Sequence, residues 1–260
     1  TRRSSDLEIT SLTFNNASQK PTASTTTGVS GETITFDVSN AKTAAGTYSS
    51  TATCSSVTGN NVCGNYTLTN ATTSYTIAQY DISNATIAST SNKTYTGSQI
   101  KPTPAVTAFT DVTLTSGTDF TYSYTNNTNV GTATITITGK GNYKGTKSAT
   151  FKITAKAITA KSGSTSKTYD GTALTYKTTG SIVSGSLASG HTATYSSSGT
   201  ITDVGNVANT LDTVTIKDSN GTDVTANYTI TKQNGTLTVN AKSLAVVWTH
   251  IDDLVYSNAA

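Results

Sequence analysis

The chain has 260 residues, a net charge of +3 and only 12% charged residues, while threonine alone occupies 60 positions. Thr and Asn are poor helix formers, and 13 Tyr with only 3 Pro argue against a disordered chain. This composition predicts an all-β, exported protein. It excludes a densely basic surface for nucleic acid, and no apolar run approaches the roughly 18 residues of a transmembrane helix, so membrane insertion is not expected.

The chain contains no methionine, even at position 1. We therefore expect a processed chain or a piece of a longer protein.

The first predicted module, residues 1–78, contains both cysteines, in the run TATCSSVTGNNVCGNYT. The turn formers between Cys54 and Cys63 predict a hairpin in which the two cysteines face each other and form a disulfide. Neither CxxC spacing nor a neighbouring histidine is present, so zinc is not expected. A disulfide implies an oxidising compartment. Strands are expected at 32–39 and 67–78, where apolar and polar residues alternate.

The second predicted module, residues 79–156, has its clearest strand at 131–139, where Ala or Ile alternates with Thr in GTATITITG. Tyrosines such as Tyr122 and Tyr124, and Tyr195 further on, are candidates for stacking on sugars. Tyrosines in strands more often pack against neighbouring strands, and this second interpretation is kept beside the first.

The third predicted module, residues 157–242, includes a strand pair at 212–225 with a type I′ turn at Asn220-Gly221. The run KDSNGTDVT around that turn offers oxygen ligands for Ca²⁺, but it lacks the spacing of a DxDxDG loop. Asp170, in a Tyr-Asp-Gly turn, and His191, in a predicted loop, are interpreted as structural. Because no acid–base pair with a credible partner exists, no enzymatic activity, cofactor or metal site is expected.

Two sequence anchors recur in the same order along the chain. The first is an aromatic residue followed by turn formers, at Phe14-Asn15-Asn16-Ala17, Tyr95-Thr96-Gly97-Ser98, Tyr169-Asp170-Gly171-Thr172 and Tyr256-Ser257-Asn258-Ala259. The second is an Asn-Tyr pair that opens a strand, at Asn65-Tyr66, Asn142-Tyr143 and Asn227-Tyr228. Such self-similarity predicts tandem Ig-like β-sandwich modules. Since no Gly/Ser or Pro linker separates the modules, we expect them to be arranged as a stiff rod.

Several of these segments resemble repeats of bacterial surface proteins. KTYDGTALT at 167–175, with ANYTITKQNGTLTV at 226–239, is similar to the YDG repeat. NKTYTGSQIKPTPAV at 92–106, with VGTATITITGKGNYKGTKSATFKI at 130–153, resembles the related MBG-type, or bacterial Ig-like, repeat. The first module is interpreted as a diverged copy. The resemblance implies a large secreted or cell-wall protein, an adhesin or a stalk, and it brings no catalytic residues.

Residues 243–260 match the start of a fourth module. Leu244, Val246, Val247 and Trp248 fall on an apolar strand with no sheet of its own to join. One interpretation is that the chain is cut from a longer array. The other is strand donation, in which this strand completes the sheet of a neighbouring copy.

Taken together, the residues predict an extracellular structural or adhesive repeat region, a stalk, of a bacterial surface protein that is secreted or attached to the cell surface. One alternative is a subunit of a self-assembling extracellular filament joined by strand donation. Another is a mucin-type glycan-binding module. The expected partners are neighbouring copies of the same chain or further repeats, with a host or matrix glycan as a further candidate, and nucleic acid is not expected.

Overall fold

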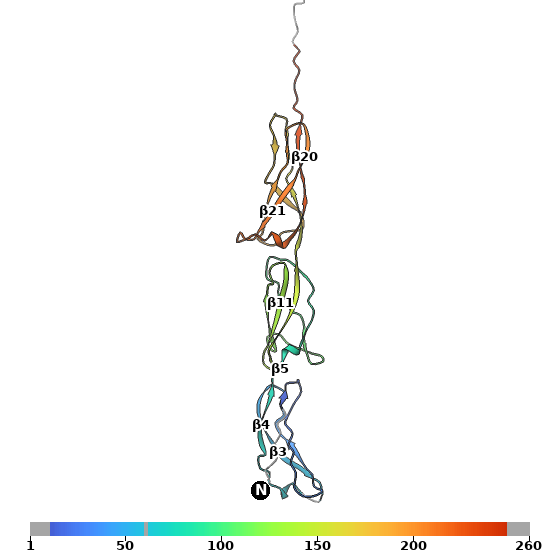
Figure 1. Ribbon diagram of the computed structural model, residues 1–260, viewed down its shortest axis with the longest axis vertical. Coiled ribbons are helices and arrows are strands. Elements are labelled where there is room, and N and C mark those ends of the chain that lie inside the picture. Colours follow the sequence, from blue (N-terminus) through green and yellow to red (C-terminus); the bar gives the residue numbers. More distant parts are fainter. Residues whose placement is uncertain (1–10, 60–61, 249–260) are drawn as a thin grey trace, which may run out of the picture. The chain divides into compact units, whose positions relative to one another are not determined.

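The computed structural model describes residues 11–59 and 62–248 (Figure 1). Nearly all regular structure there is β-strand, and the helical pieces are three short 3-10 turns, η1 (Cys63–Asn65), η2 (Ile82–Asn84) and η3 (Thr225–Asn227). The predicted all-β fold is confirmed. Within these two ranges, no helix has the length and apolar character needed to cross a bilayer.

Two compact units divide the chain. The first consists of the residues up to Lys93 together with Gln99–Ile153, and the second of Thr94–Ser98 and the residues from Thr154 onward. The first unit therefore takes in the predicted modules 1–78 and most of 79–156. The division of this unit into two modules stays a prediction.

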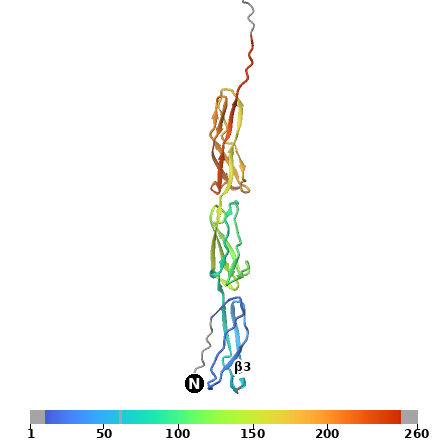
Figure 2. The ribbon, with the colours of Figure 1, turned by 90° about the vertical axis from the view of Figure 1, so that its right-hand side faces the viewer.

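The first half of the first unit is a four-stranded sheet in the order β1-β4-β3-β2. Its strands are β1 (Leu12–Thr13), β2 (Ile34–Val38), β3 (Gly46–Val57) and β4 (Thr72–Ala78). β1 runs parallel to β4, and the other neighbours are antiparallel. β3, the longest of these strands, lies between β2 and β4 (Figures 1 and 2).

Threonine hydroxyls join β3 and β4 across one exposed face of this sheet. The Thr47 and Thr76 hydroxyl oxygens are 3.1 Å apart, and those of Thr51 and Thr72 are 3.0 Å apart. Threonine suits such a position because its branched side chain packs on the pleat and its hydroxyl can donate and accept at once. Cross-strand hydroxyl pairs thus take the place that ion pairs hold in more highly charged sheets.

The rest of the first unit consists of further short strands arranged as three small sheets, β10-β11-β13-β7, β6-β8-β9 and β12-β5. These strands are β5 (Tyr80–Asp81), β6 (Thr86–Ile87), β7 (Lys93–Thr94), β8 (Val106–Ala108), β9 (Val112–Thr113), β10 (Phe120–Thr125), β11 (Gly131–Gly139), β12 (Tyr143–Lys144) and β13 (Thr146–Thr154). The strand expected at 131–139 is confirmed as β11. Its Ala133, Ile135 and Ile137 are fully buried, as the alternation requires.

One buried cluster joins the two halves of the first unit. Phe14 and Ile77 from the first half belong to the same cluster as Phe120 and Tyr143 from the second. The rings of Phe14 and Tyr143 meet edge to face with centroids 5.4 Å apart, a favoured geometry for aromatic pairs. The two halves are therefore held together by apolar packing.

The regular structure of the second unit consists of strands and the 3-10 turn η3. Its strands are β14 (Lys156–Ser162), β15 (Thr165–Thr168), β16 (Leu174–Thr175), β17 (Gly180–Ser184), β18 (Thr192–Ser197), β19 (Thr200–Ile201), β20 (Gly205–Asn209), β21 (Leu211–Lys217), β22 (Tyr228–Gln233) and β23 (Gly235–Asn240). The sheets are β17-β14-β22, β15-β23-β20, β16-β19 and β18-β21. β14 is the middle strand of the first of these, antiparallel to β17 and parallel to β22.

The strand pair expected at 212–225 needs a correction. β21 ends at Lys217, and a turn follows in which the Gly221 N–H donates to the Asp218 carbonyl and the Asp218 N–H donates to the Thr222 carbonyl. A type I′ turn requires positive φ at both central residues. Here Gly221 has φ +81° while Asn220 does not have a positive φ, so the predicted type I′ turn is wrong.

The aromatic anchors within the described residues share one local structure. The side-chain oxygen of the residue after the aromatic accepts the backbone N–H two residues on, at Asn15, Thr96 and Asp170. The next residue has positive φ in each case, as Asn and Gly allow. The anchor at 256–259 lies outside the described residues.

Candidate functional site

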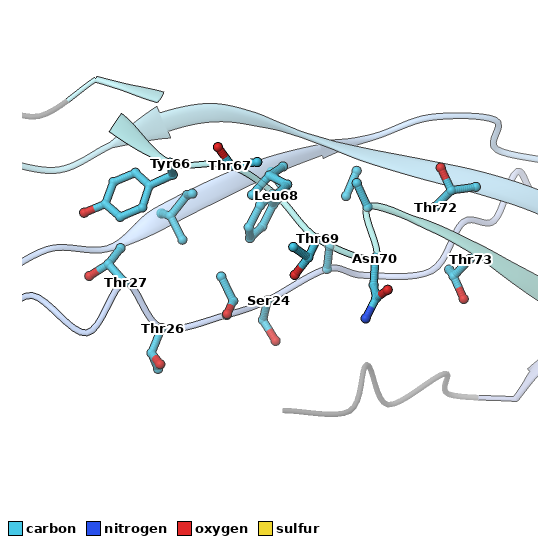
Figure 3. A pocket seen from close by; sticks show the side chains of 16 residues that line it. Ser24, Thr26, Thr27, Tyr66, Thr67, Leu68, Thr69, Asn70, Thr72 and Thr73 are labelled. Atoms are coloured by element: carbon cyan, nitrogen blue, oxygen red, sulfur yellow. The ribbon is translucent and has the colours of Figure 1, made fainter. Parts of the chain in front are cut away.

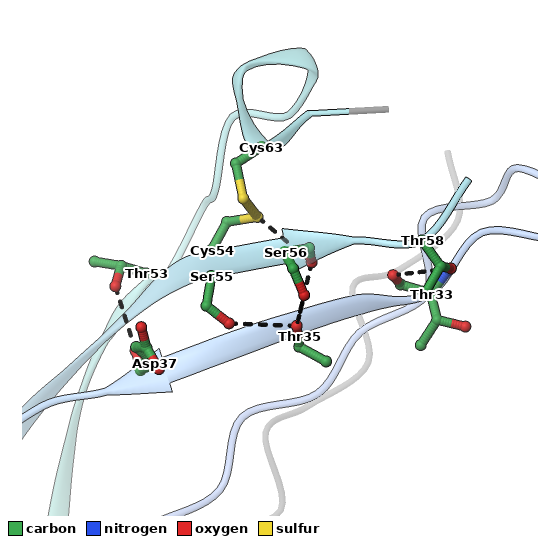
Figure 4. The surroundings of a disulfide bond; sticks show 9 residues. All are labelled: Thr33, Thr35, Asp37, Thr53, Cys54, Ser55, Ser56, Thr58 and Cys63. Carbon is green, nitrogen blue, oxygen red and sulfur yellow. Dashed lines mark hydrogen bonds between the residues drawn. A yellow bond between two sulfur atoms is a disulfide. The ribbon is translucent and has the colours of Figure 1, made fainter. Parts of the chain in front are cut away.

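The predicted disulfide is present. Cys54 and Cys63 are bonded, with their Cα atoms 5.7 Å apart (Figure 4). The expected hairpin around them is wrong, because Cys54 lies in β3, whose antiparallel partner on that side is β2, and Cys63 opens η1. The disulfide thus ties the first residue of η1 to β3.

A groove of about 390 Å³ opens beside this disulfide (Figure 3). Its apolar floor comes from β2 and β3, with Ile34, Phe36 and Ala52. One wall is the chain 23–27 and the other is the chain 66–71, which follows η1. Both walls carry threonines, so the groove combines an apolar floor with hydroxyl-bearing edges.

Neither wall of the groove forms a strand in the described part of the chain. A strand was expected at 67–78, but β4 begins only at Thr72, and this part of the prediction is wrong. The alternation of β4 does not continue into 67–71, because Leu68 is out of phase with Tyr75 and Ile77 and the intervening Asn70 has φ +55°. A strand also needs a neighbour for its backbone N–H and C=O groups, and no described residue supplies one to Thr67–Asn70.

One ionisable group stands on the groove wall. The Tyr66 hydroxyl donates to the Glu32 carboxylate, and this hydrogen bond raises the pKa of the tyrosine, with burial adding to the effect. The phenol is therefore held in its neutral, donating form at ordinary pH.

The apolar residues predicted for strand donation are the most exposed large hydrophobic side chains of the described chain. Leu244, Val246, Val247 and Trp248 are 81, 74, 82 and 90% exposed. Residues 241–248 form no strand. His250 and the rest of 249–260 lie outside the described residues.

The residues weighed for Ca²⁺ are engaged in the turn itself. The Asp218 carboxylate accepts the N–H groups of Asn220 and Thr222, both at 2.9 Å. Hydrogen bonds from the side chain of Thr225 and then from its backbone N–H lower the pKa of the neighbouring Asp223. Among the described residues, no group of three or more His, Cys, Asp or Glu side chains is arranged to hold a metal ion.

Asp170 is held by its own turn. Its carboxylate accepts from the Lys167 ammonium at 2.7 Å and from the Thr172 N–H at 2.9 Å. The hydrogen bond from Lys167 contributes most to lowering the pKa of Asp170, followed by those from Thr172. A carboxylate so fixed in its ionised form closes a turn and is poorly suited to accept a proton in catalysis.

His191 is also used in packing. Its Nδ1 lies 2.8 Å from the Tyr228 hydroxyl, and its ring lies against Tyr95 within the same unit. The Tyr228 hydroxyl accepts the Ala188 N–H as well. His191 therefore packs against the rings of Tyr95 and Tyr228.

The tyrosines considered for sugar stacking are half-buried. The Tyr122 and Tyr124 hydroxyls donate to the carbonyls of Pro104 and Pro102, and their rings stack on each other with centroids 6.1 Å apart. Burial raises the pKa of both, and likewise that of Tyr195. These side chains pack within their own units.

Comparison with protein-family models, with curated proteins and with solved structures gave no match for this chain. The candidate site therefore rests on the geometry above, namely the open groove and the exposed apolar segment. The groove residues did not stand out in the sequence, because their side chains are ordinary strand side chains.

Proposed function

We propose that this chain is a load-bearing structural segment, a stalk or adhesive repeat region on a bacterial surface, built of Ig-like sandwich modules in tandem and related to the MBG and YDG repeats. The observation that carries the proposal is the continuity of its strands. A single residue, Gln79, separates β4 from β5, and a single residue, Ala155, separates β13 from β14. Because only one residue separates the strands at each of these points, a force applied along the chain is transmitted directly from one strand to the next.

The disulfide and the packing support this role. A Cys54–Cys63 bond fits an oxidising, extracellular location. The edge-to-face contact of Phe14 with Tyr143 resists separation of the two halves of the first unit. Tyr95 makes the corresponding contact with Tyr228 in the second unit, at 5.6 Å.

Single-molecule pulling on the full chain, held at its two ends, tests the proposal. We expect discrete unfolding events under force and, on reduction, a longer extension of the first unit. The disulfide spans a sequence separation of 9, so the gain is roughly 25 Å at about 3.4 Å per residue. Extension without resolved force peaks would contradict a load-bearing role. Binding to a mucin-type glycan stays a prediction, and a glycan array tests it.

A further inference from the structure

We propose that the groove in the first unit accepts a β-strand, and that residues 242–248 of a second copy of this chain fill it, lying parallel to 66–71 and joining copies head to tail. This assembly does not depend on the load-bearing role. The donor is the exposed apolar segment already described, and the acceptor is the groove beside the disulfide.

The first step is a register match between the two units. Residues 65–78 align without a gap with 227–240, so that Ile77 corresponds to Val239. Both make the same two pairings: Ile77 faces Leu12 in parallel and Gly46 in antiparallel, while Val239 faces Lys167 in parallel and Gly205 in antiparallel. The half-unit 11–78 and the second unit therefore share one strand layout.

The second step concerns a strand position that no described residue of the first half-unit occupies. In the second unit, β14 lies between β17 and β22. The counterpart of β22 is 66–71 and that of β17 is 25–29, and these segments form or adjoin the two walls of the groove. The groove thus occupies the position of β14. Among residues 11–59 and 62–248, no strand of the half-unit lies there to pair with the two flanking segments.

The third step concerns the sequence that stands where β14 would be. By the spacing that relates Phe14 to Tyr169, Lys156–Ser162 corresponds to residues 1–7, TRRSSDL. Arg3 would replace the buried Ile158. Placing an unpaired charge on an apolar floor is strongly unfavourable, so this sequence is a poor filling strand.

The fourth step is the fit of the donor. Residues 241–248, AKSLAVVW, align with 155–162, AKAITAKS. Leu244 and Val246 correspond to Ile158 and Ala160, which are buried in β14. A cavity of roughly 150 Å³ holds one benzene ring, so a groove of 390 Å³ has room for two or three apolar side chains.

The aromatic anchors supply an independent observation. Phe14 packs edge to face on Tyr143, and Tyr95 packs on Tyr228, at interplanar angles of 76° and 78°. Each pair joins an anchor aromatic to the tyrosine of an Asn-Tyr pair. Among the described residues, the anchor aromatic Tyr169, which is 39% exposed, packs on no tyrosine of an Asn-Tyr pair. Likewise, Tyr66 of the pair Asn65-Tyr66 packs on no anchor aromatic of the described chain. Head-to-tail assembly brings these two rings together.

The pairing of β14 with β22 also fixes the register of the interface. Lys156 faces Tyr228, Ile158 faces Ile230 and Thr159 faces Thr231. Transferred to the proposed interface, Lys242 faces Tyr66, Leu244 faces Leu68 and Ala245 faces Thr69.

The first experiment measures the assembly of the full chain by analytical ultracentrifugation and electron microscopy over a range of concentrations. Wild type is expected to form linear assemblies. The double variant Leu244→Asp/Val246→Asp, altered on the inward face, is expected to lose assembly completely while keeping the circular dichroism of wild type. The matched control, Ala245→Thr/Val247→Lys, introduces the outward residues of β14 and should assemble as wild type does. Equal assembly of both variants, or a wild type that stays monomeric, would overturn the proposal.

The second experiment tests the register and the identity of the donor. Chains carrying Thr69→Cys are mixed with chains carrying Ala245→Cys under mild oxidation. We expect a covalent dimer at these two positions, and none when Thr47→Cys replaces Thr69→Cys.

Two other occupants of the groove give different results. A Thr69→Cys/Ala245→Cys chain that cross-links only within a monomer would mean that the donor fills its own groove. A Ser4→Cys/Thr69→Cys chain that cross-links fully while wild type stays monomeric would mean that residues 1–7 fill it. Either result overturns assembly through a second copy.

Discussion

The half-unit 11–78 and the second unit follow one strand layout, yet they differ at one position in it. In the second unit the middle strand β14 is present, and its neighbours β17 and β22 are regular strands. In the half-unit the corresponding position is a groove, and the segments on either side of it are not strands. The difference teaches that a strand in a sheet depends on its neighbour as much as on its own sequence.

The largest expected effect comes from the anchor aromatics. Phe14→Ala removes a buried ring from the shared cluster of the first unit, and such changes lower the free energy of unfolding by about 3–5 kcal/mol. Tyr169→Ala, at the exposed anchor, should change the stability of the monomer by less than about 1 kcal/mol. Urea unfolding of both variants measures the contrast, and equal losses would contradict it.

A smaller loss of stability is expected from a substitution in β14, the middle strand of its sheet. Ile158→Ala leaves a cavity in the core of the second unit and should lower its free energy of unfolding by about 2–4 kcal/mol. Leu244→Ala, at the corresponding position of the exposed segment, should leave the monomer within about 0.5 kcal/mol of wild type. Thermal unfolding at low protein concentration compares them. A destabilised Leu244→Ala monomer would show that this segment already packs within its own chain.

The disulfide offers a third comparison. Replacing both Cys54 and Cys63 by Ser should lower the stability of the first unit by about 2–3 kcal/mol, since the closed loop is short. The second unit has no disulfide and should unfold as before. Hydrogen exchange resolved along the sequence can follow the two units separately, and a loss of protection in the second unit would contradict the prediction.

The smallest effect is a dependence on alkaline pH. Burial raises the pKa of Tyr143 in the folded first unit, with Asp119 and Tyr80 adding to the rise. An unfolded tyrosine titrates near pH 10, so the stability linked to this group is fully present below that pH and is lost as the pH climbs through the higher folded value. Tyr143→Phe should flatten the decline in stability above about pH 10, as measured by urea unfolding at each pH.

Part of the fold could be predicted from the sequence because it depends on local pattern. The strand expected at 131–139 is confirmed with the same bounds, since alternation alone marks a half-buried strand. The turn residues at the aromatic anchors likewise bond within their own loops, as short-range chemistry allows.

The remaining features depend on distant partners. At 67–71 no strand forms, since Asn70 has φ +55° and no described residue pairs with the backbone of 67–70. The hairpin expected around the cysteines failed because β3 already pairs with β2 and β4, which leaves Cys63 in a short 3-10 turn. A sequence comparison of 1–7 with 156–162 points to the groove, because TRRSSDL has no apolar residue at the position of Ile158.

The threonine pairs that join β3 and β4 bear on the pH and the salt concentration that the protein can tolerate. Hydroxyl groups do not titrate between acid and alkaline extremes, and their hydrogen bonds are not screened by dissolved ions. Lys167–Asp170 is the sole ion pair within the described ranges. A sheet stabilised by such hydroxyl pairs should keep the same stability in fresh water, in brine and in mildly acidic fluid.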